Sequence, residues 1–273
     1  NHGKILAGSV HLDCVAAAAP NGTNTVKLIS ETYHQYLTVD LDHLEPMEKT
    51  TGTEPLLRGI FAGLKNRGMK GEGFDAYVTS GVIGGAGVSS SASFEMLVCV
   101  MVDYLFNGGK RDMVTYAKAG QYAENKYWMK GSGLLDQLAC AVGGIITIDF
   151  AAIENPSIRE VNCNFDELRY DLVIVNTGKG HADLSAEYSA VPNEMKAVAR
   201  YFGKEVLQQV DEDAVIENVQ AIHKAAGDRA VLRAFHFFEE NKRVDAQVKA
   251  LEEKDFDTFF RKVTESGDSS WKW

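Results

Sequence analysis

The richest chemical content lies in the segment GGAGVSSSAS at residues 84–93. Its three glycines within four residues let the backbone turn tightly and approach a ligand without a Cβ in the way. Three serines follow, where a strongly apolar helix is expected to begin. The free N–H groups and positive dipole end of that helix suit a phosphate. From the spacing alone, a glycine-rich turn closed by a serine N-cap is the simpler interpretation.

Carboxylates in the next two segments could also do chemistry. Asp136 follows two glycines in GSGLLDQLACAVGG (131–144), where it could point into a cleft, and Gln137 could help orient a ligand. Taken alone, Asp136 is an ordinary first-turn aspartate favoured by the helix dipole. Glu124 lies twelve residues upstream on the preceding predicted helix, and a lone helical glutamate is usually a solvated surface charge.

Other phosphate-binding and metal-binding motifs are not found in the sequence. It contains no GxxxxGK[ST], GVIGGAGVSS does not complete GxGxxG, and no VAIK or HRD set occurs. These patterns exclude a Walker-A loop, a Rossmann fingerprint and a protein kinase. The seven histidines show no HExxH or close-paired spacing, so we interpret them as surface or packing residues.

Composition narrows the class of protein further. With 28 basic against 38 acidic residues, the net charge of −10 argues against electrostatic nucleic-acid binding. A hydrophobic content of 45% is enough for a sizeable core, and no run of 18 apolar residues predicts a membrane span. Four scattered cysteines without a CxxC pair indicate reduced thiols. We therefore expect a cytoplasmic protein that acts on small molecules, with no nucleic-acid or membrane partner and an unknown oligomeric state.

Periodicity predicts an α+β fold with strands in the first half and helices in the second. Strands are expected within residues 4–41 and at 74–80, 145–150 and 171–176. Helices are expected at 54–67, 94–105, 112–126, 134–142, 185–202, 211–226, 228–253 and 255–265. The stretch ENPSIREVNCNF (154–165) is typical of an inter-domain connection.

The glycine/serine loop resembles the second conserved motif of the GHMP small-molecule kinases, a Gly-Leu-Ser-Ser-Ser-Ala stretch before a helix. Here it reads Gly87-Val88-Ser89-Ser90-Ser91-Ala92, with Val in place of Leu. The resemblance implies that the loop wraps the phosphates of ATP and that Ser91 ligates Mg²⁺. The phosphate-binding residues would be Gly85, Ala86, Gly87, Val88, Ser89, Ser90 and Ser91.

Two further segments are similar to galactokinases within that superfamily. The Gly-Ile-Met-Asp-Gln stretch of galactokinases matches residues 133–137, with Leu135 in place of Met. The match implies that Asp136 is the catalytic carboxylate facing the sugar hydroxyl, that Gly133 contacts the sugar and that Glu124 is a second metal ligand. So few protein oxygens suit a Mg²⁺ ion that keeps waters and bridges phosphates.

Tyr188 in SAEY matches the tyrosine whose hydroxyl contacts galactose in that family. A tyrosine packed on its helix face is an equally good interpretation. Galactokinases usually follow this tyrosine with a pair of arginines, whereas this chain has Pro192-Asn193-Glu194. The departure puts the sugar in doubt more than the fold.

The resemblance covers nearly the whole chain and implies a two-domain GHMP kinase. Residues 1–155 would form a ribosomal-protein-S5-like, ATP-binding N-terminal domain, and residues 156–273 an incomplete ferredoxin-like C-terminal domain. The implied reaction is ATP-dependent phosphorylation of the anomeric hydroxyl of galactose to galactose 1-phosphate. The alternatives are a kinase for another sugar, such as N-acetylgalactosamine, or a non-catalytic galactose/ATP-binding sensor.

The ends of the chain carry one more expectation. Asn1-His2-Gly3-Lys4 resembles the tail of the family's first motif, and the glycine-rich third motif is not found in the sequence. We therefore expect a chain truncated at both ends, with weak galactose binding and poor or no kinase activity.

Overall fold

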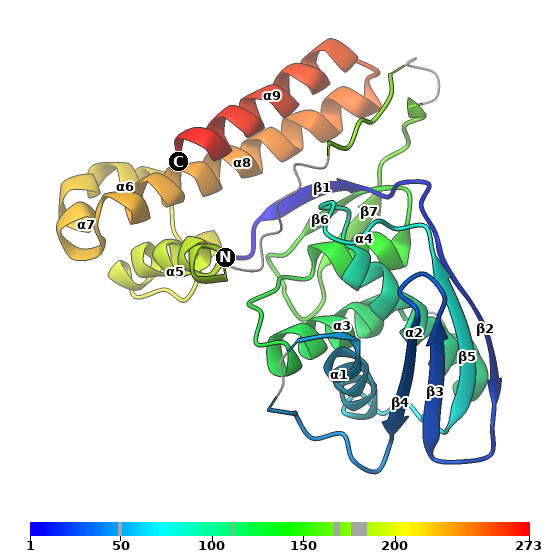
Figure 1. Cartoon of the computed structure of the whole chain (residues 1–273). Coiled ribbons are helices and arrows are strands. Elements are labelled where there is room, and N and C mark those ends of the chain that lie inside the picture. The colour runs from blue at the N-terminus through cyan, green and yellow to red at the C-terminus, as the bar shows by residue number, and fades with distance from the viewer. Residues whose placement is uncertain (49–50, 111, 166–169, 176–184) are drawn as a thin grey trace. The chain divides into compact units, whose positions relative to one another are not determined.

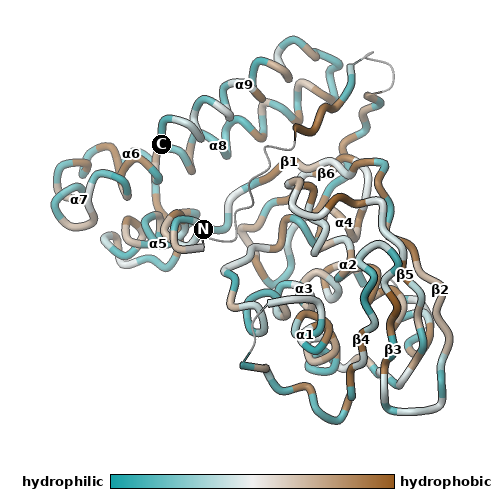
Figure 2. The backbone as a smooth tube through the Cα atoms, viewed as in Figure 1, coloured by the Kyte–Doolittle hydropathy of each residue, from teal (hydrophilic) through white to brown (hydrophobic). Residues whose placement is uncertain are grey.

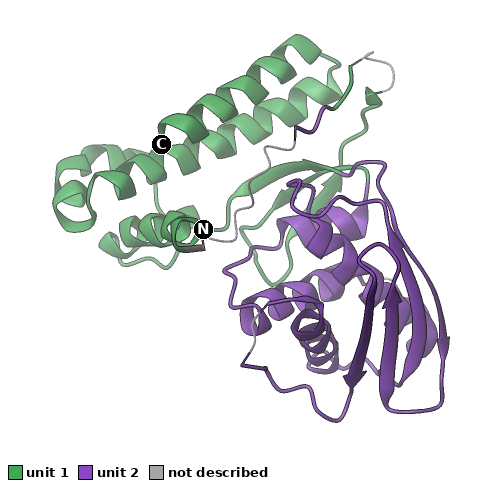
Figure 3. Ribbon diagram, in the orientation of Figure 1, with its two compact units in different colours: residues 1–8, 144–172, 182–273 green, residues 9–143, 173–181 purple. Residues whose placement is uncertain are grey.

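The computed structural model of the chain forms two compact units (Figures 1 and 3). It describes residues 1–48, 51–110, 112–165, 170–175 and 185–273. Unit 1 contains residues 1–8, 144–172 and 182–273, and unit 2 contains residues 9–143 and 173–181. The predicted domain boundary at residue 155 does not coincide with this division by contacts and stays a prediction.

Unit 2 is built on a four-stranded sheet in the order β2-β5-β3-β4. The strands are β2 (Cys14–Pro20), β3 (Thr25–Ser30), β4 (Gln35–Asp40) and β5 (Phe74–Ser80). Strands β3 and β5 are parallel, and the other two pairings are antiparallel. On β3, Val26 and Leu28 are buried while Lys27 and Ile29 point outward, as the alternation of a sheet with one covered face requires.

Four helices complete the described part of unit 2. They are α1 (Thr53–Lys65), α2 (Ser90–Phe106), α3 (Met113–Tyr127) and α4 (Leu135–Val142). Each confirms a predicted helix, and Asp112 caps α3 by accepting a hydrogen bond from the Thr115 N–H at 3.0 Å. Helix α2 is buried on more than its apolar stripe, because Glu95 and Asp103 are buried as well.

Unit 1 combines a three-stranded antiparallel sheet with the C-terminal helices. The sheet has the order β1-β6-β7 and consists of β1 (Lys4–Gly8), β6 (Ile145–Asp149) and β7 (Ser157–Glu160). The other elements are α5 (Ser185–Tyr201), the 3₁₀ turn η3 (Leu207–Gln209), α6 (Glu212–Glu217), α7 (Val219–Ala226), α8 (Asp228–Glu252) and α9 (Phe256–Lys272). Val244, Val248 and Leu251 of α8 pack in one cluster with Leu6 of β1.

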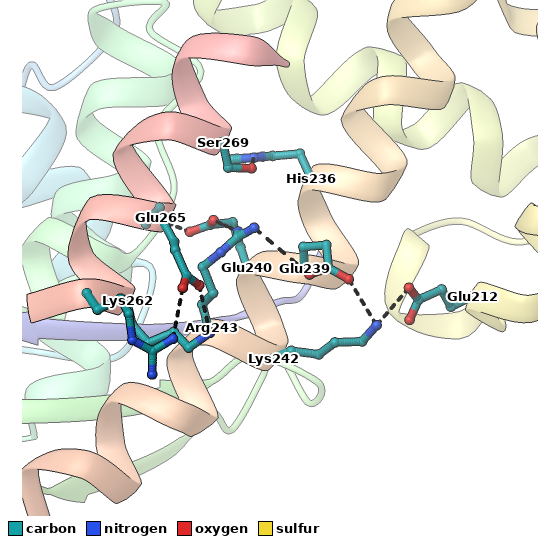
Figure 4. Close-up of polar contacts among 11 residues, drawn as sticks. Glu212, His236, Glu239, Glu240, Lys242, Arg243, Lys262, Glu265 and Ser269 are labelled. Carbon is teal, nitrogen blue, oxygen red and sulfur yellow. Dashed lines mark hydrogen bonds and ion pairs between the residues drawn. The ribbon is translucent and has the colours of Figure 1, made fainter. Parts of the chain in front are cut away.

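A polar network joins α8 and α9 (Figure 4). The Ser266 hydroxyl donates to Glu240 at 2.6 Å, and the His236 ring nitrogen lies 2.8 Å from the Ser269 hydroxyl. Along α9, hydrophilic and hydrophobic residues are interspersed in the hydropathy colouring (Figure 2), which is typical of a helix with one packed face. Helix α9 extends to Lys272 rather than ending near residue 265 as predicted.

Two predictions about the middle of the chain were wrong. Residues 154–165 are more than a connection, because β7 pairs with β6 through Ile158 opposite Ile148. Residues 171–175 of the predicted strand 171–176 have no regular secondary structure, and Asn176 lies outside the described residues. Apolar β-rich composition forms a strand only where a neighbouring strand satisfies its backbone groups, and no sheet pairing of the described residues includes 171–175.

The described part of the chain contains no helix that is long and apolar enough to cross a membrane.

Close packing of α1 against α3 generates a stability prediction. A Cβ on Gly59 would lie 2.7 Å from the Ala123 Cα and 2.8 Å from its Cβ. Gly59→Ala should therefore lower the free energy of unfolding by about 1–3 kcal/mol through overpacking. Gly267→Ala on α9 is the matched control, since nothing lies within 4 Å of its Cβ position, and it should stabilise by about 0.5–1 kcal/mol. Urea denaturation followed by circular dichroism measures both, and equal effects of the same sign would contradict the packing described.

Candidate active site

The glycine/serine loop connects the end of β5 to the start of α2. Gly85 and Gly87 have positive φ angles of 74° and 76°, which glycine adopts without a steric penalty. Ser89, at the N-cap position of α2, has φ 56° and makes no side-chain capping hydrogen bond. A non-glycine residue in this region is strained. The loop therefore differs from the simple serine-capped turn that spacing alone suggested.

Ser91 and Glu124, the two predicted metal ligands, lie in hydrogen-bond contact. The Ser91 hydroxyl on α2 donates to Glu124 Oε1 on α3 at 3.0 Å, across 33 positions of sequence. Glu124 is only 2% exposed, so it is not the solvated surface charge that a lone helical glutamate usually is. The structure thus places two oxygen donors beside the loop.

Lys130 adds a positive charge to this pair. Its Nζ lies 2.8 Å from the same Glu124 Oε1, while 44% of the lysine side chain remains exposed. Met129, just after α3, has φ 53° and turns the chain back. The Lys130 N–H then donates to the Glu124 carbonyl at 3.0 Å. Lys130 therefore contacts Glu124 through both its backbone and its side chain.

The segment after Lys130 leads to the predicted catalytic helix and is fixed against α3. The Ser132 N–H donates to Asn125 Oδ1 at 2.7 Å, and Gln121 donates to the Ser132 carbonyl at 3.1 Å. Asp136 lies half-buried in the first turn of α4. A Cβ on Gly133 would meet nothing within 4 Å, so protein packing does not require a glycine there.

Glu95 is a carboxylic acid in this region that the sequence analysis missed. It is fully buried on α2, one helical turn after Ser91, and its Oε2 accepts a hydrogen bond from Gln137 at 3.0 Å. Gln137 is therefore buried and engaged with protein, instead of orienting a ligand as expected. The i, i+4 spacing from Ser91 could have indicated Glu95, because residues four apart share a helix face.

The charges of these groups act on one another. Burial, together with the nearby charges of Glu124 and Asp136, raises the pKa of Glu95 to about 8, although the Gln137 hydrogen bond and the Lys130 ammonium act in the opposite direction. A group acts on a neighbour in this way only over a short distance. Glu95, Glu124, Asp136 and Lys130 thus form one electrostatic cluster in unit 2.

Tyr188, the predicted sugar contact, is exposed on α5 of unit 1, and its role stays a prediction.

Unit 2 also contains a cavity of about 350 Å³, lined by Phe61, Lys70 and Glu72 among others. It lies at the Phe74 end of β5, roughly 20 Å from the loop at the Ser80 end, and is separate from the site.

Comparison with known proteins finds similarity to one group of kinases. Residues 56–144 match the GHMP kinases N terminal domain. The chain is 26% identical over 275 residues to the galactokinase of Clostridium tetani, covering 97% of this chain and 67% of that protein. It is 30% identical over 263 residues to the galactokinase of Lactococcus lactis, covering 92% of this chain and 63% of that protein. Residues 56–144 thus match the N-terminal domain of the GHMP kinases, and nearly the whole chain is similar to galactokinases.

A solved galactokinase structure shares the α+β architecture of the chain. The crystal structure of Lactococcus lactis galactokinase complexed with galactose superposes with a TM-score of 0.84 at 26% identity, covering all of this chain and 70% of that one. The family match runs from α1 to α4 and includes the loop, Glu124 and Asp136. The fold class expected from the sequence is confirmed.

The buried Glu95 predicts a pH dependence of stability. Its pKa in the folded chain, about 8, lies above the ordinary value of 4.5. The folded state therefore holds a proton that the unfolded state releases, and this contribution to stability falls as pH rises from about 4.5 to 8. Glu95→Gln keeps an acceptor for Gln137 but cannot ionise, so it should reduce the loss of stability between pH 5 and pH 8.

Urea midpoints at pH 5 and pH 8 measure this difference. Glu72→Gln, at an exposed position, is the matched control and should leave the pH dependence of the wild type unchanged. An identical pH dependence for Glu95→Gln and the wild type would show that Glu95 does not hold a proton in the folded chain.

Proposed function

We propose that the protein is an ATP-dependent sugar kinase that phosphorylates the anomeric hydroxyl of galactose. The contact between Ser91 and Glu124 beside the glycine/serine loop carries this proposal, because it brings cation ligands to a phosphate-binding helix start. The similarity to galactokinases over nearly the whole chain supports galactose as the substrate. The cytoplasmic location expected from the sequence stays a prediction.

The chemistry of the two donors fits Mg²⁺. Serine and carboxylate oxygens are ligands that Mg²⁺ accepts, and the ion usually retains waters and binds substrate phosphates. No cluster of three or more His, Cys, Asp or Glu that could hold a metal is present among the described residues, which agrees with an ion that takes few ligands from the protein. Ser91 and Glu124 would hold the ion, and its charge would offset that of the phosphates.

Phosphoryl transfer needs positioning and charge stabilisation more than covalent chemistry from the protein. In the proposed mechanism, backbone N–H groups of residues 85–91 bind the phosphates of ATP. Asp136 accepts a hydrogen bond from the attacking sugar hydroxyl, orients it for in-line attack and takes its proton. A Cβ on Gly133 would meet nothing within 4 Å, so the sugar has room to contact the chain there.

Replacement of Asp136, the proposed catalytic aspartate, tests this function. Asp136→Asn should lower galactose-dependent ADP release by about 10²–10⁴-fold, the range for loss of a general base, with little change in ATP affinity because the phosphates bind elsewhere. Asp257→Asn is the matched control, since Asp257 is an exposed first-turn aspartate of α9. A coupled ADP-release assay and calorimetric ATP titration measure both quantities, on this chain and on the longest gene product that contains it.

The choice of sugar separates the proposed function from its alternatives. Galactose and N-acetylgalactosamine are compared in the same assay at matched concentrations. Turnover with galactose supports the proposal, and turnover with N-acetylgalactosamine but not galactose makes N-acetylgalactosamine the substrate. If this chain and the longer gene product both bind ATP and galactose but release no ADP, the protein is a sensor. Near-normal turnover by Asp136→Asn would remove this residue from the mechanism.

A further inference from the structure

The ion pair between Lys130 and Glu124 differs from an ordinary surface ion pair. Long surface side chains lose conformational entropy when they pair, so most such pairs contribute little. Here the backbone already places Lys130: Met129 turns the chain back in the left-handed region, and the Lys130 N–H donates to the Glu124 carbonyl at 3.0 Å. The ammonium at 2.8 Å from Glu124 Oε1 is therefore held close to its partner by the fold.

Burial of the Glu124 carboxylate makes compensation of its negative charge necessary. A carboxylate that is 2% exposed loses its hydration and needs a cation or several hydrogen-bond donors in compensation. Glu124 Oε1 receives both the Ser91 hydroxyl and the Lys130 ammonium. In the chain without ligands, the two oxygens that would hold a divalent cation are thus already satisfied.

We propose that Lys130 is an internal competitor of the divalent cation at Glu124, and that the metal binds only by displacing its ammonium. The identity of the nucleotide in this scheme rests on the proposed function, whereas the competition involves only Lys130, Glu124 and the ion. An ammonium and a divalent cation on one carboxylate oxygen repel each other strongly at such short distances. In this scheme the two cations therefore compete for the oxygen.

The competition has a consequence for the order of binding. The displaced Lys130 has a flexible four-carbon stem and is 44% exposed, so its charge can move to another anion. Without nucleotide, displacement costs the ion pair of Lys130 with Glu124, and the metal alone binds weakly. When nucleotide phosphates are bound at the adjacent loop, they offer Lys130 a new partner, so the metal binds together with the nucleotide.

Binding of Mn²⁺ alone to Lys130→Met tests this proposal. Free Mn²⁺ is measured by electron paramagnetic resonance, without nucleotide or sugar. Because the pair combines a buried carboxylate with a half-exposed ammonium, its removal should tighten Mn²⁺ binding by about tenfold. Lys126→Met is the matched control, since it removes the same charge at an exposed position near the end of α3, the helix that carries Glu124. It should change the Mn²⁺ affinity by less than about twofold.

Further variants keep the result interpretable. Lys130→Arg retains the charge and should bind Mn²⁺ like the wild type, and Glu124→Gln in the Lys130→Met background should abolish the gain. Lys130→Gln can still donate a hydrogen bond to Glu124. It serves as the neutral variant if circular dichroism shows that Lys130→Met is unfolded, and it should also bind Mn²⁺ more tightly than the wild type.

Two results would overturn the proposal. Equal Mn²⁺ affinities of the folded neutral variant and the wild type would show that Lys130 does not compete. Absence of Mn²⁺ binding in both would show that Glu124 is not a cation site. Galactose-dependent ADP release is measured separately on the wild type. If ADP release is absent but the neutral Lys130 variant binds Mn²⁺ about tenfold more tightly, only the proposed function is contradicted. If ADP release is present but the Mn²⁺ affinity of the variant is unchanged, only the competition is contradicted.

Discussion

The site depends on one constraint, the compensation of a buried carboxylate. Glu124 loses its hydration inside unit 2, and a buried charge is tolerated only when it is paired and hydrogen-bonded. Ser91 and Lys130 satisfy this requirement. Because they come from α2 and from the segment after α3, the requirement also fixes the start of α2 relative to α3. The contacts of Ser91 and Lys130 with Glu124 thus hold α2 against α3 and also form the proposed cation site.

A second buried carboxyl group extends this arrangement to α4. A Cβ on Gly120 would lie 2.4 Å from Glu95 Oε2, so a glycine on α3 makes the room that the Glu95 carboxyl group occupies. Through Gln137, Glu95 also holds the helix that begins beside Asp136. Besides the protonated Glu95, the cluster contains two acidic groups, Glu124 and Asp136, and one lysine, and this balance favours a cation there.

Local sequence signals predicted most of the helices and strands of unit 2, whereas the roles of the site residues came from the resemblance to GHMP kinases and stay predictions. The period of the helices, the alternation of the strands and the Asp112 cap depend on neighbours in sequence, and the structure confirmed them. The position of Lys130 depends on the left-handed conformation of Met129, which no residue type there demands. Strand β7 depends on its pairing with the preceding strand β6, and residues 171–175 have no such pairing among the described residues. The residue types of a segment alone do not decide whether a neighbouring strand is in register with it.

The most direct test of the central claim is a crystal structure with Mn²⁺ and a non-hydrolysable ATP analogue, because anomalous scattering locates the metal independently of the fold. We expect one Mn²⁺ peak within coordination distance of Ser91 Oγ and a Glu124 carboxylate oxygen. The phosphates should lie against the N–H groups of residues 85–91, with Lys130 turned away from Glu124. A nucleotide bound elsewhere, or a metal that contacts neither Ser91 nor Glu124, would contradict it.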